Sequence, residues 1–135
     1  MNRQFPAIDL IASIQKKINE KTSLTCYDHV EDSTPSPLVF AELVRTNPAN
    51  TKTTYRTTYT VWLHIISEET DSSVPVLKYI KEVEEALTED IEVPESFWLV
   101  NQTNEGIQVI KKDESGEKHA VLQFSFLVSY GFKTK

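Results

Sequence analysis

Residues 55–66, with the sequence YRTTYTVWLHII, carry the clearest structural signal in the chain. Two sets of side chains alternate along this stretch, and β-branched and aromatic residues are abundant, as is typical of a β-strand. The even-numbered Arg56, Thr58 and Thr60 are expected to face away from the core. The odd-numbered side chains are more apolar, so we expect this set to face the core: Tyr55, Thr57, Tyr59, Val61, Leu63 and Ile65.

Two strands and a helix are predicted before this segment. Residues 23–27 alternate, with Leu24 and Cys26 on one side, and residues 38–44 begin with an apolar run that suits a strand covered on both faces. The helix is predicted over residues 6–18, where apolar residues recur at steps of three and four: Ile8, Ile11, Ile14 and Ile18, with Leu10 widening the stripe.

A second helix is predicted after residue 66. Ser72 or Ser73 is a suitable N-cap, Pro75 fits the first turn, and helical spacing continues to about Thr88. The apolar residues at this spacing are Val76, Leu77, Ile80, Val83 and Leu87.

Three more strands are predicted after the second helix. Residues 97–102 and 107–112 are short candidates, separated by turn-forming residues around Gly106. Residues 119–130 form a long last strand, whose even positions carry an apolar stripe: Ala120, Leu122, Phe124, Phe126, Val128 and Tyr130.

The predicted order is therefore helix, three strands, helix, three strands. This order indicates an α+β fold in which an antiparallel β-sheet carries two α-helices packed on one face. The chain has 135 residues, of which 39% are hydrophobic and 25% charged, and these ordinary values predict a single domain over residues 1–135.

Charge and cysteine content restrict the class of protein. A net charge of -6 argues against sequence-specific nucleic-acid binding, because affinity for phosphate backbones comes from lysine and arginine. Cys26 is the only cysteine, so an intramolecular disulfide is impossible and a reducing compartment fits best. The apolar run near the C-terminus is too short to cross a bilayer, so no membrane association is expected.

Motifs for catalysis, cofactors and metals are missing from the sequence. It contains no nucleophile elbow and no glycine-rich phosphate loop, and its three histidines lie in separate predicted elements. A thiol enzyme using Cys26 with His29 is conceivable, but a cysteine on an apolar strand face is usually core filling. We therefore expect no enzymatic activity, no cofactor and no metal site.

An aromatic cluster in the long central strand offers another hypothesis. Tyr55, Tyr59 and Trp62 lie near Lys52 and Arg56, which could form a stacking platform for a single nucleic-acid strand. The acidic balance of the chain favours sheet packing as the role of these rings.

Two polar segments are candidate partner surfaces. Residues 28–37 are rich in turn formers and are expected to form an ordered loop, whereas residues 45–54 are expected to be mobile. Contacts concentrate on loops held by a rigid scaffold, and we also expect the long third strand to offer an exposed edge. The predicted interface residues are Asp28, His29, Glu31, Asp32, Arg45, Asn47, Asn50, Lys52 and Arg56.

Residues 27–42, YDHVEDSTPSPLVFAE, resemble the tail-completion, or tail-terminator, proteins of long-tailed bacteriophages and prophages. That family has Tyr-Asp, a short loop with proline and aspartate, and then a proline before a strand that ends near Gly-Glu. Here Leu38 replaces the frequent aromatic residue, Ala41 stands at the usual glycine, and Glu31 stands where proline is common. The order of the predicted elements follows the family over nearly the whole chain.

The resemblance implies a structural virion protein. It would form a ring of copies of itself, a hexamer, that caps the tail-tube protein and presents a joining surface to the head-connector protein. DNA would pass through this ring, and the protein would occupy the bacterial host cytoplasm during assembly and the virion tail afterwards. The alternative from the residues alone is a monomeric small-ligand-binding or regulatory domain with a cleft between sheet and helices.

Overall fold

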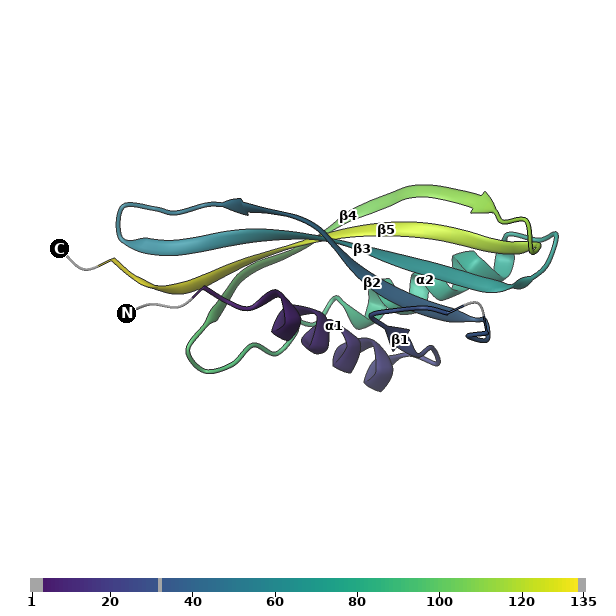
Figure 1. Ribbon diagram of the computed structural model, residues 1–135, viewed down its shortest axis with the longest axis horizontal. Helices are drawn as coiled ribbons and strands as arrows, with labels where there is room; N and C mark the ends of the chain where they lie inside the picture. Colours follow the sequence, from purple (N-terminus) through teal and green to yellow (C-terminus); the bar gives the residue numbers. More distant parts are fainter. Residues whose placement is uncertain (1–3, 32, 134–135) are drawn as a thin grey trace.

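The computed structural model describes residues 4–31 and 33–133 (Figure 1). The described chain forms two helices and five strands, in the order α1 (Ala7–Lys21), β1 (Cys26–Tyr27), β2 (Leu38–Pro48), β3 (Thr54–Glu69), α2 (Val74–Ala86), β4 (Trp98–Lys112) and β5 (Glu117–Phe132). The predicted α+β class is confirmed.

The described strands form one mixed sheet in the order β1-β2-β3-β5-β4. The long strands β2, β3, β5 and β4 pair antiparallel, whereas the short β1 runs parallel to β2. Both helices lie on the same side of this sheet (Figure 1). We call this side the helix face and the other side the open face. The sheet was predicted to be antiparallel throughout, and β1 departs from this prediction because it runs parallel to β2.

The sequence predicted one strand too many after α2. Residues 97–102 and 107–112 belong to a single strand, β4, and the turn formers between them produce irregular pairing with β5 around Asn104 and Gly106. Gly106 has φ +93°, a conformation that L side chains rarely adopt, so a bulge is accommodated here without ending the strand. The observed order is α-β-β-β-α-β-β.

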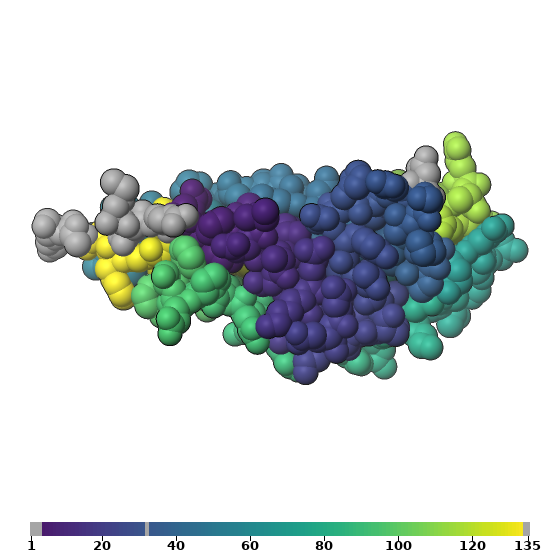
Figure 2. Space-filling view, turned by 60° about the horizontal axis from the view of Figure 1, so that its bottom comes forward, coloured from purple at the N-terminus to yellow at the C-terminus, as the bar shows by residue number. Residues whose placement is uncertain are grey.

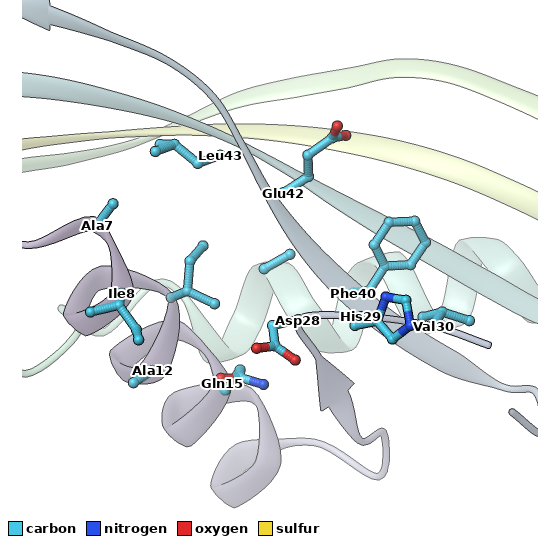
Figure 3. Close-up of a pocket in the computed structure, with 12 residues that line it drawn as sticks. Ala7, Ile8, Ala12, Gln15, Asp28, His29, Val30, Phe40, Glu42 and Leu43 are labelled. Carbon is cyan, nitrogen blue, oxygen red and sulfur yellow. The ribbon is translucent and has the colours of Figure 1, made fainter.

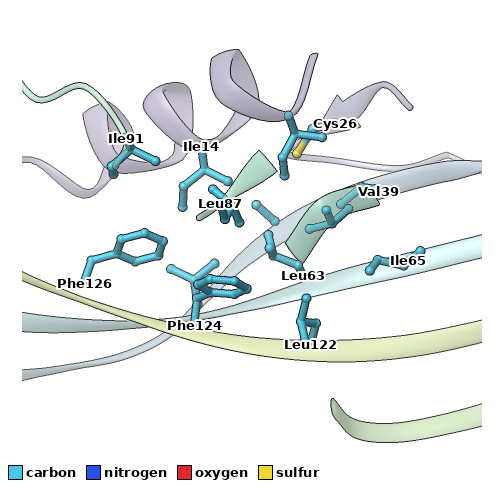
Figure 4. Packing of buried hydrophobic residues seen from close by; sticks show 14 of the residues in the cluster. Ile14, Cys26, Val39, Leu63, Ile65, Leu87, Ile91, Leu122, Phe124 and Phe126 are labelled. Carbon is cyan, nitrogen blue, oxygen red and sulfur yellow. The ribbon is translucent and has the colours of Figure 1, made fainter. Parts of the chain in front are cut away.

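The core lies between the helix face and the two helices (Figure 4). Tyr59, Val61, Leu63 and Ile65 of β3 are buried there as predicted, and so are the even-numbered residues of β5 from Ala120 to Val128. Thr60 faces away from this core as predicted, yet only 3% of its surface is exposed. Its small side chain lies between Arg45 of β2 and Ser125 of β5, so neighbouring strands cover it.

The buried stripe of α1 differs from the predicted one. Leu10, Ile14 and Ile18 are buried at steps of four, whereas Ile8 is 77% exposed. A step of two residues turns an α-helix by about 200°, so Ile8 cannot share the face of Leu10. Leu10 is therefore central to the stripe, and Ile8 is available on the surface.

The second helix starts where its capping residues predict. Ser73 is the N-cap position, and the backbone N–H of Val74 donates to Ser72 Oγ over 3.1 Å. Leu77 is exposed, contrary to its assignment to the apolar stripe. The buried positions of the helix are Val76, Ile80, Val83 and Ala86, followed by Leu87 at the C-cap.

Residues 45–54, expected to be a mobile loop, form the end of a long hairpin. Strand β2 continues to Pro48, which pairs with Thr57, and β3 begins at Thr54. In the turn, Thr51 N donates to the carbonyl of Thr54 over 3.0 Å. Cross-strand hydrogen bonds hold this segment, rather than the burial of apolar side chains. Its sequence therefore shows no apolar periodicity, so strands were not predicted there.

Candidate assembly surfaces

The sheet has two edges, and neither is the predicted edge of the third strand. β3 lies between β2 and β5, so its two sides are paired. β4 forms one edge. At the other edge β1 pairs with β2 only at Val39 and Phe40, so no described strand pairs with β2 on that side from Ala41 to Pro48.

The outer side of β1 is already satisfied by α1. The backbone N–H of Cys26 donates to Asn19 Oδ1 over 2.7 Å, and Gln15 Nε2 donates to the carbonyl of Cys26 over 3.2 Å. These side chains take the backbone groups that a further strand would need beside β1. The open part of this edge is therefore β2 beyond Phe40.

A groove of about 600 Å³ follows the open edge of β2 (Figure 3). One wall comes from α1, with Ile8 and Ile11, and another from residues 28–30. In the space-filling view, α1 and the segment that follows it form one continuous covering on this side of the molecule (Figure 2). Glu42 belongs to the floor of the groove, but its carboxylate points away from α1 (Figure 3). The groove thus has an apolar helix wall and acidic groups near one end.

Exposed apolar side chains gather along the opposite edge. Nine large hydrophobic residues are exposed in the described chain, and five of them belong to β4, each between 38% and 50% exposed: Trp98, Val100, Ile107, Val109 and Ile110. A concentration of this kind on a strand that pairs on one side only is typical of a surface that becomes covered.

The open face carries a chain of four polar side chains from different elements. His64 Nε2 lies 2.7 Å from Glu42 Oε1, and His64 Nδ1 lies 2.9 Å from His119 Nε2. His119 Nδ1 lies 3.6 Å from Asp113 Oδ2. The ring of Phe40 stacks on His64 at 4.2 Å between centroids, which covers the middle of the chain.

The pKa of His119 depends on its burial and on its neighbours. Burial lowers the pKa of His119, Asp113 opposes that change, and His64 and Lys111 add to it. When His64 carries its proton on Nε2, that nitrogen donates to Glu42, and Nδ1 can accept from Nε2–H of His119. In this arrangement both ring nitrogens of His64 have a hydrogen-bond partner.

This chain of groups is the part of the molecule that sequence reasoning missed. The histidines were assigned to separate elements, yet the pairing of β3 with β5 brings His64 and His119 together, while His29 stays apart beside the groove. A weak signal was present, because the alternation in β3 already placed His64 on the side away from the core.

The predicted interface residues fall into two groups at opposite ends of the molecule (Figure 1). Asp28 and His29 line the groove and Glu31 is exposed nearby, whereas Asp32 lies outside the described residues. The second group belongs to the β2–β3 hairpin: Arg45, Asn47, Asn50, Lys52 and Arg56. In this hairpin Arg56 Nε donates to the carbonyl of Ala49 over 3.0 Å, so Arg56 also supports the turn.

The environments of the other candidate groups are less suited to chemistry. Burial raises the pKa of Cys26 to about 12, and Asp28 adds to this rise, so the thiolate needed for nucleophilic attack is disfavoured. Tyr59 and Trp62 lie on opposite faces of β3, so they cannot form one stacking platform. Residues 4–31 and 33–133 contain no cluster of three metal-binding side chains.

None of the helices in the described residues has the length and apolar content needed to cross a membrane.

The fold and its surfaces define a class. Apolar side chains gather along a strand edge without a described partner, which is typical of a surface that becomes covered on assembly. The family model described as "Putative tail termination protein" matches residues 1–135, and the chain belongs to this family of phage tail terminators. Membership implies a structural, non-enzymatic role in the virion tail.

A solved structure shares this fold. One chain of the "Virion of native gene transfer agent (GTA) particle" matches with a TM-score of 0.70 and 18% sequence identity, covering 91% of this chain and 96% of that chain. At this identity the match supports the arrangement of helices and strands. No curated protein matches the sequence.

Proposed function

We propose that this tail terminator assembles into a hexameric ring on the head-proximal end of the tail tube, stops tube growth, and offers a joining surface to the head connector. The observation that carries the proposal is the match of the tail-termination family over residues 1–135. The whole chain acts as one domain in this proposal. It assembles in the bacterial host cytoplasm and remains in the virion tail.

The two groups of predicted interface residues suit a protein that joins two partners. A cap must contact the tube on one side and the connector on the other, and the groups lie at opposite ends of the molecule (Figure 1). One group is acidic, with Asp28, Glu31 and Asp32, and the hairpin group is basic, with Arg45, Lys52 and Arg56. Opposite charges on two surfaces would help each partner to find its own side.

The net charge of the chain supports a channel through which DNA passes. A protein with a net charge of -6 gains little from counterion release on a phosphate backbone, so DNA would not adhere to the ring.

Electron microscopy of tail tubes tests the proposal. Purified protein is added to growing tail tubes, and negative-stain images are compared with those of tubes grown without it. We expect tubes of uniform length with a ring at one end. Tubes of unchanged length without end density would refute the terminator function, and a stable monomer that binds a small molecule would favour a ligand-binding domain.

The acidic group is tested by reversing its charge. The triple variant Asp28→Lys, Glu31→Lys, Asp32→Lys should fold normally, because exposed charges such as those of Asp28 and Glu31 contribute little to stability. It should nevertheless yield few joined particles in extracts that lack the normal protein. The matched control reverses three exposed acidic residues elsewhere: Asp90, Glu95 and Glu114. Equal joining by both variants would remove the acidic loop from the interface.

A further inference from the structure

We propose that neighbouring copies in the ring join through their sheet edges, with β4 of one copy entering the groove beside β2 of the next. The occupant of the groove is thus a second copy of this chain, and residues 41–48 of β2 gain a strand partner. The inference rests on the ring of the proposed function and specifies which surfaces build it.

Strand direction fits this contact. β2 is antiparallel to β3, β3 to β5, and β5 to β4, so β4 runs antiparallel to β2. Rotation about a ring axis that lies along the strands preserves their directions. A neighbouring β4 therefore arrives antiparallel to β2, and the alternation of the sheet continues across the subunit boundary.

The backbone of both edges supplies the hydrogen bonds. An edge strand presents unpaired N–H and C=O groups, and β4 has 15 residues along its outer edge. Within β4, the side chains of Asn104 and Gln108 already bond the N–H of Gly106 and the carbonyls of Glu105 and Gly106, so the rest of the strand supplies the groups for pairing. On the other edge β1 is closed by Asn19 and Gln15 of α1, so β1 acts as a stop where the open part of β2 begins. This arrangement directs an incoming strand to residues 41–48.

The apolar side chains of β4 then match the wall of the groove. Ile107 pairs with Leu122 and Ile110 pairs with Ala120, and directly opposite residues of a sheet share a face. Since Leu122 and Ala120 face the core, Ile107 and Ile110 lie on the helix face. In the groove they would therefore meet the side of the sheet where Ile8 of α1 is exposed.

The charged side chains match on the opposite face. Antiparallel addition places the C-terminal end of β4 beside the start of the open β2 edge, next to β1. Lys111 pairs with His119 and so lies on the open face, which is also where Glu42 bonds His64. Lys111 of one copy would thus approach Glu42 of the next.

Thiol cross-linking between introduced cysteines tests this contact. The double variant Ile8→Cys, Ile110→Cys is assembled on tail tubes and treated with a short bifunctional thiol reagent. Both sites are exposed, whereas the buried Cys26 has a pKa of about 12 and competes little for the reagent at neutral pH. We expect a ladder of covalent multimers that ends at the ring size, while each single variant stays monomeric.

The outcomes separate the contact from the proposed function. Rings on tubes without a ladder would overturn the edge contact and leave tail capping intact. Dimers from the single variant Ile110→Cys would also overturn it, because they would mean that β4 pairs with β4. A ladder without capped tubes would support the contact and refute the capping function.

A charge exchange provides an independent test. Lys111→Glu should reduce the multimer yield about tenfold, because it places like charges together, and adding Glu42→Lys should restore most of the loss. Lys78→Glu, at an exposed position of α2, is the control and should leave the yield unchanged. A double charge variant no better than Lys111→Glu alone would contradict the pairing of these two residues.

Discussion

The two faces of the sheet differ in what stabilises them. On the helix face, aliphatic and aromatic side chains from β3, β5 and both helices fill a continuous core (Figure 4). On the open face, hydrogen bonds link Glu42, His64 and His119, and the ring of Phe40 covers them. The helix face therefore depends on the amount of buried apolar surface, whereas the open face depends on the geometry and protonation of a few groups.

The largest effect on stability is expected on the helix face. Leu63→Ala removes a fully buried side chain and leaves a cavity, so it should lower the free energy of unfolding by about 2–5 kcal/mol. Urea denaturation of the purified variant measures this change. Thr58 of the same strand is only half-buried and lies on the open face, so Thr58→Ala should have a much smaller effect and serves as the control. Similar midpoints for both variants would place Leu63 outside the core.

Breaking the polar chain of the open face should have a smaller effect. His64→Ala leaves Glu42 and His119 without their shared partner and removes the ring beneath Phe40, which should cost about 1–3 kcal/mol. His29→Ala, at an exposed position, is the matched control and should leave stability unchanged. If urea midpoints for the two variants coincide, the chain of groups contributes nothing to the open face.

The same two faces explain how much of the fold the sequence could predict. Alternation in β3 and β5 reports which side chains are buried, so the helix face was predicted almost residue by residue. The low exposure of Thr60 was not predicted, because its small side chain is covered by its cross-strand neighbours. Ile8 was wrongly assigned to the buried stripe, because the stripe depends on which residue of the helix is central. The pattern of apolar residues in the sequence contains no information about the exposure of Thr60 or about which face of the first helix is buried.

The candidate surfaces were less predictable because they depend on strand order. Sequence patterns suggested loops at residues 28–37 and 45–54, but pairing of β2 with β3 makes the second segment a hairpin. Only the order β1-β2-β3-β5-β4 reveals that β3 is central and that β4 is an edge. The meeting of His64 and His119 likewise follows from the pairing of strands distant in sequence.

Lowering the pH should have a smaller effect on stability, and this effect should arise from the open face. Burial lowers the pKa of His119 below its ordinary value of 6.5, so the unfolded chain binds more protons than the folded protein once the pH falls through about 6.5. Stability from this group is therefore complete above that pH and decreases towards the lower pKa of the folded state. His64, Asp113, Lys111 and, through His64, Glu42 are the titratable groups facing it.

Thermal melting at pH 8 and pH 5 measures this dependence. The fall in Tm between the two pH values should be smaller for His119→Gln than for the wild-type protein, because glutamine keeps a polar side chain but does not titrate. His29→Gln, altered at an exposed site, should keep the wild-type difference. An unchanged fall in Tm for His119→Gln would assign the acid sensitivity to other groups.

The smallest effect on stability is expected at the free edge, where the two faces meet. Val109 of β4 is 45% exposed, so Val109→Lys should change the free energy of unfolding by no more than about 0.5 kcal/mol. A lysine at this position would nevertheless be placed in the subunit boundary, where a charge without a partner loses its hydration on assembly. Leu77→Lys is a closely matched control, since Leu77 is 47% exposed but lies on α2. We expect both variants to melt like the wild type, and only Val109→Lys to leave tail tubes uncapped in negative-stain images. Normal capping by Val109→Lys would mean that Val109 stays exposed in the virion, and the subunit boundary would then have to be sought away from this part of β4.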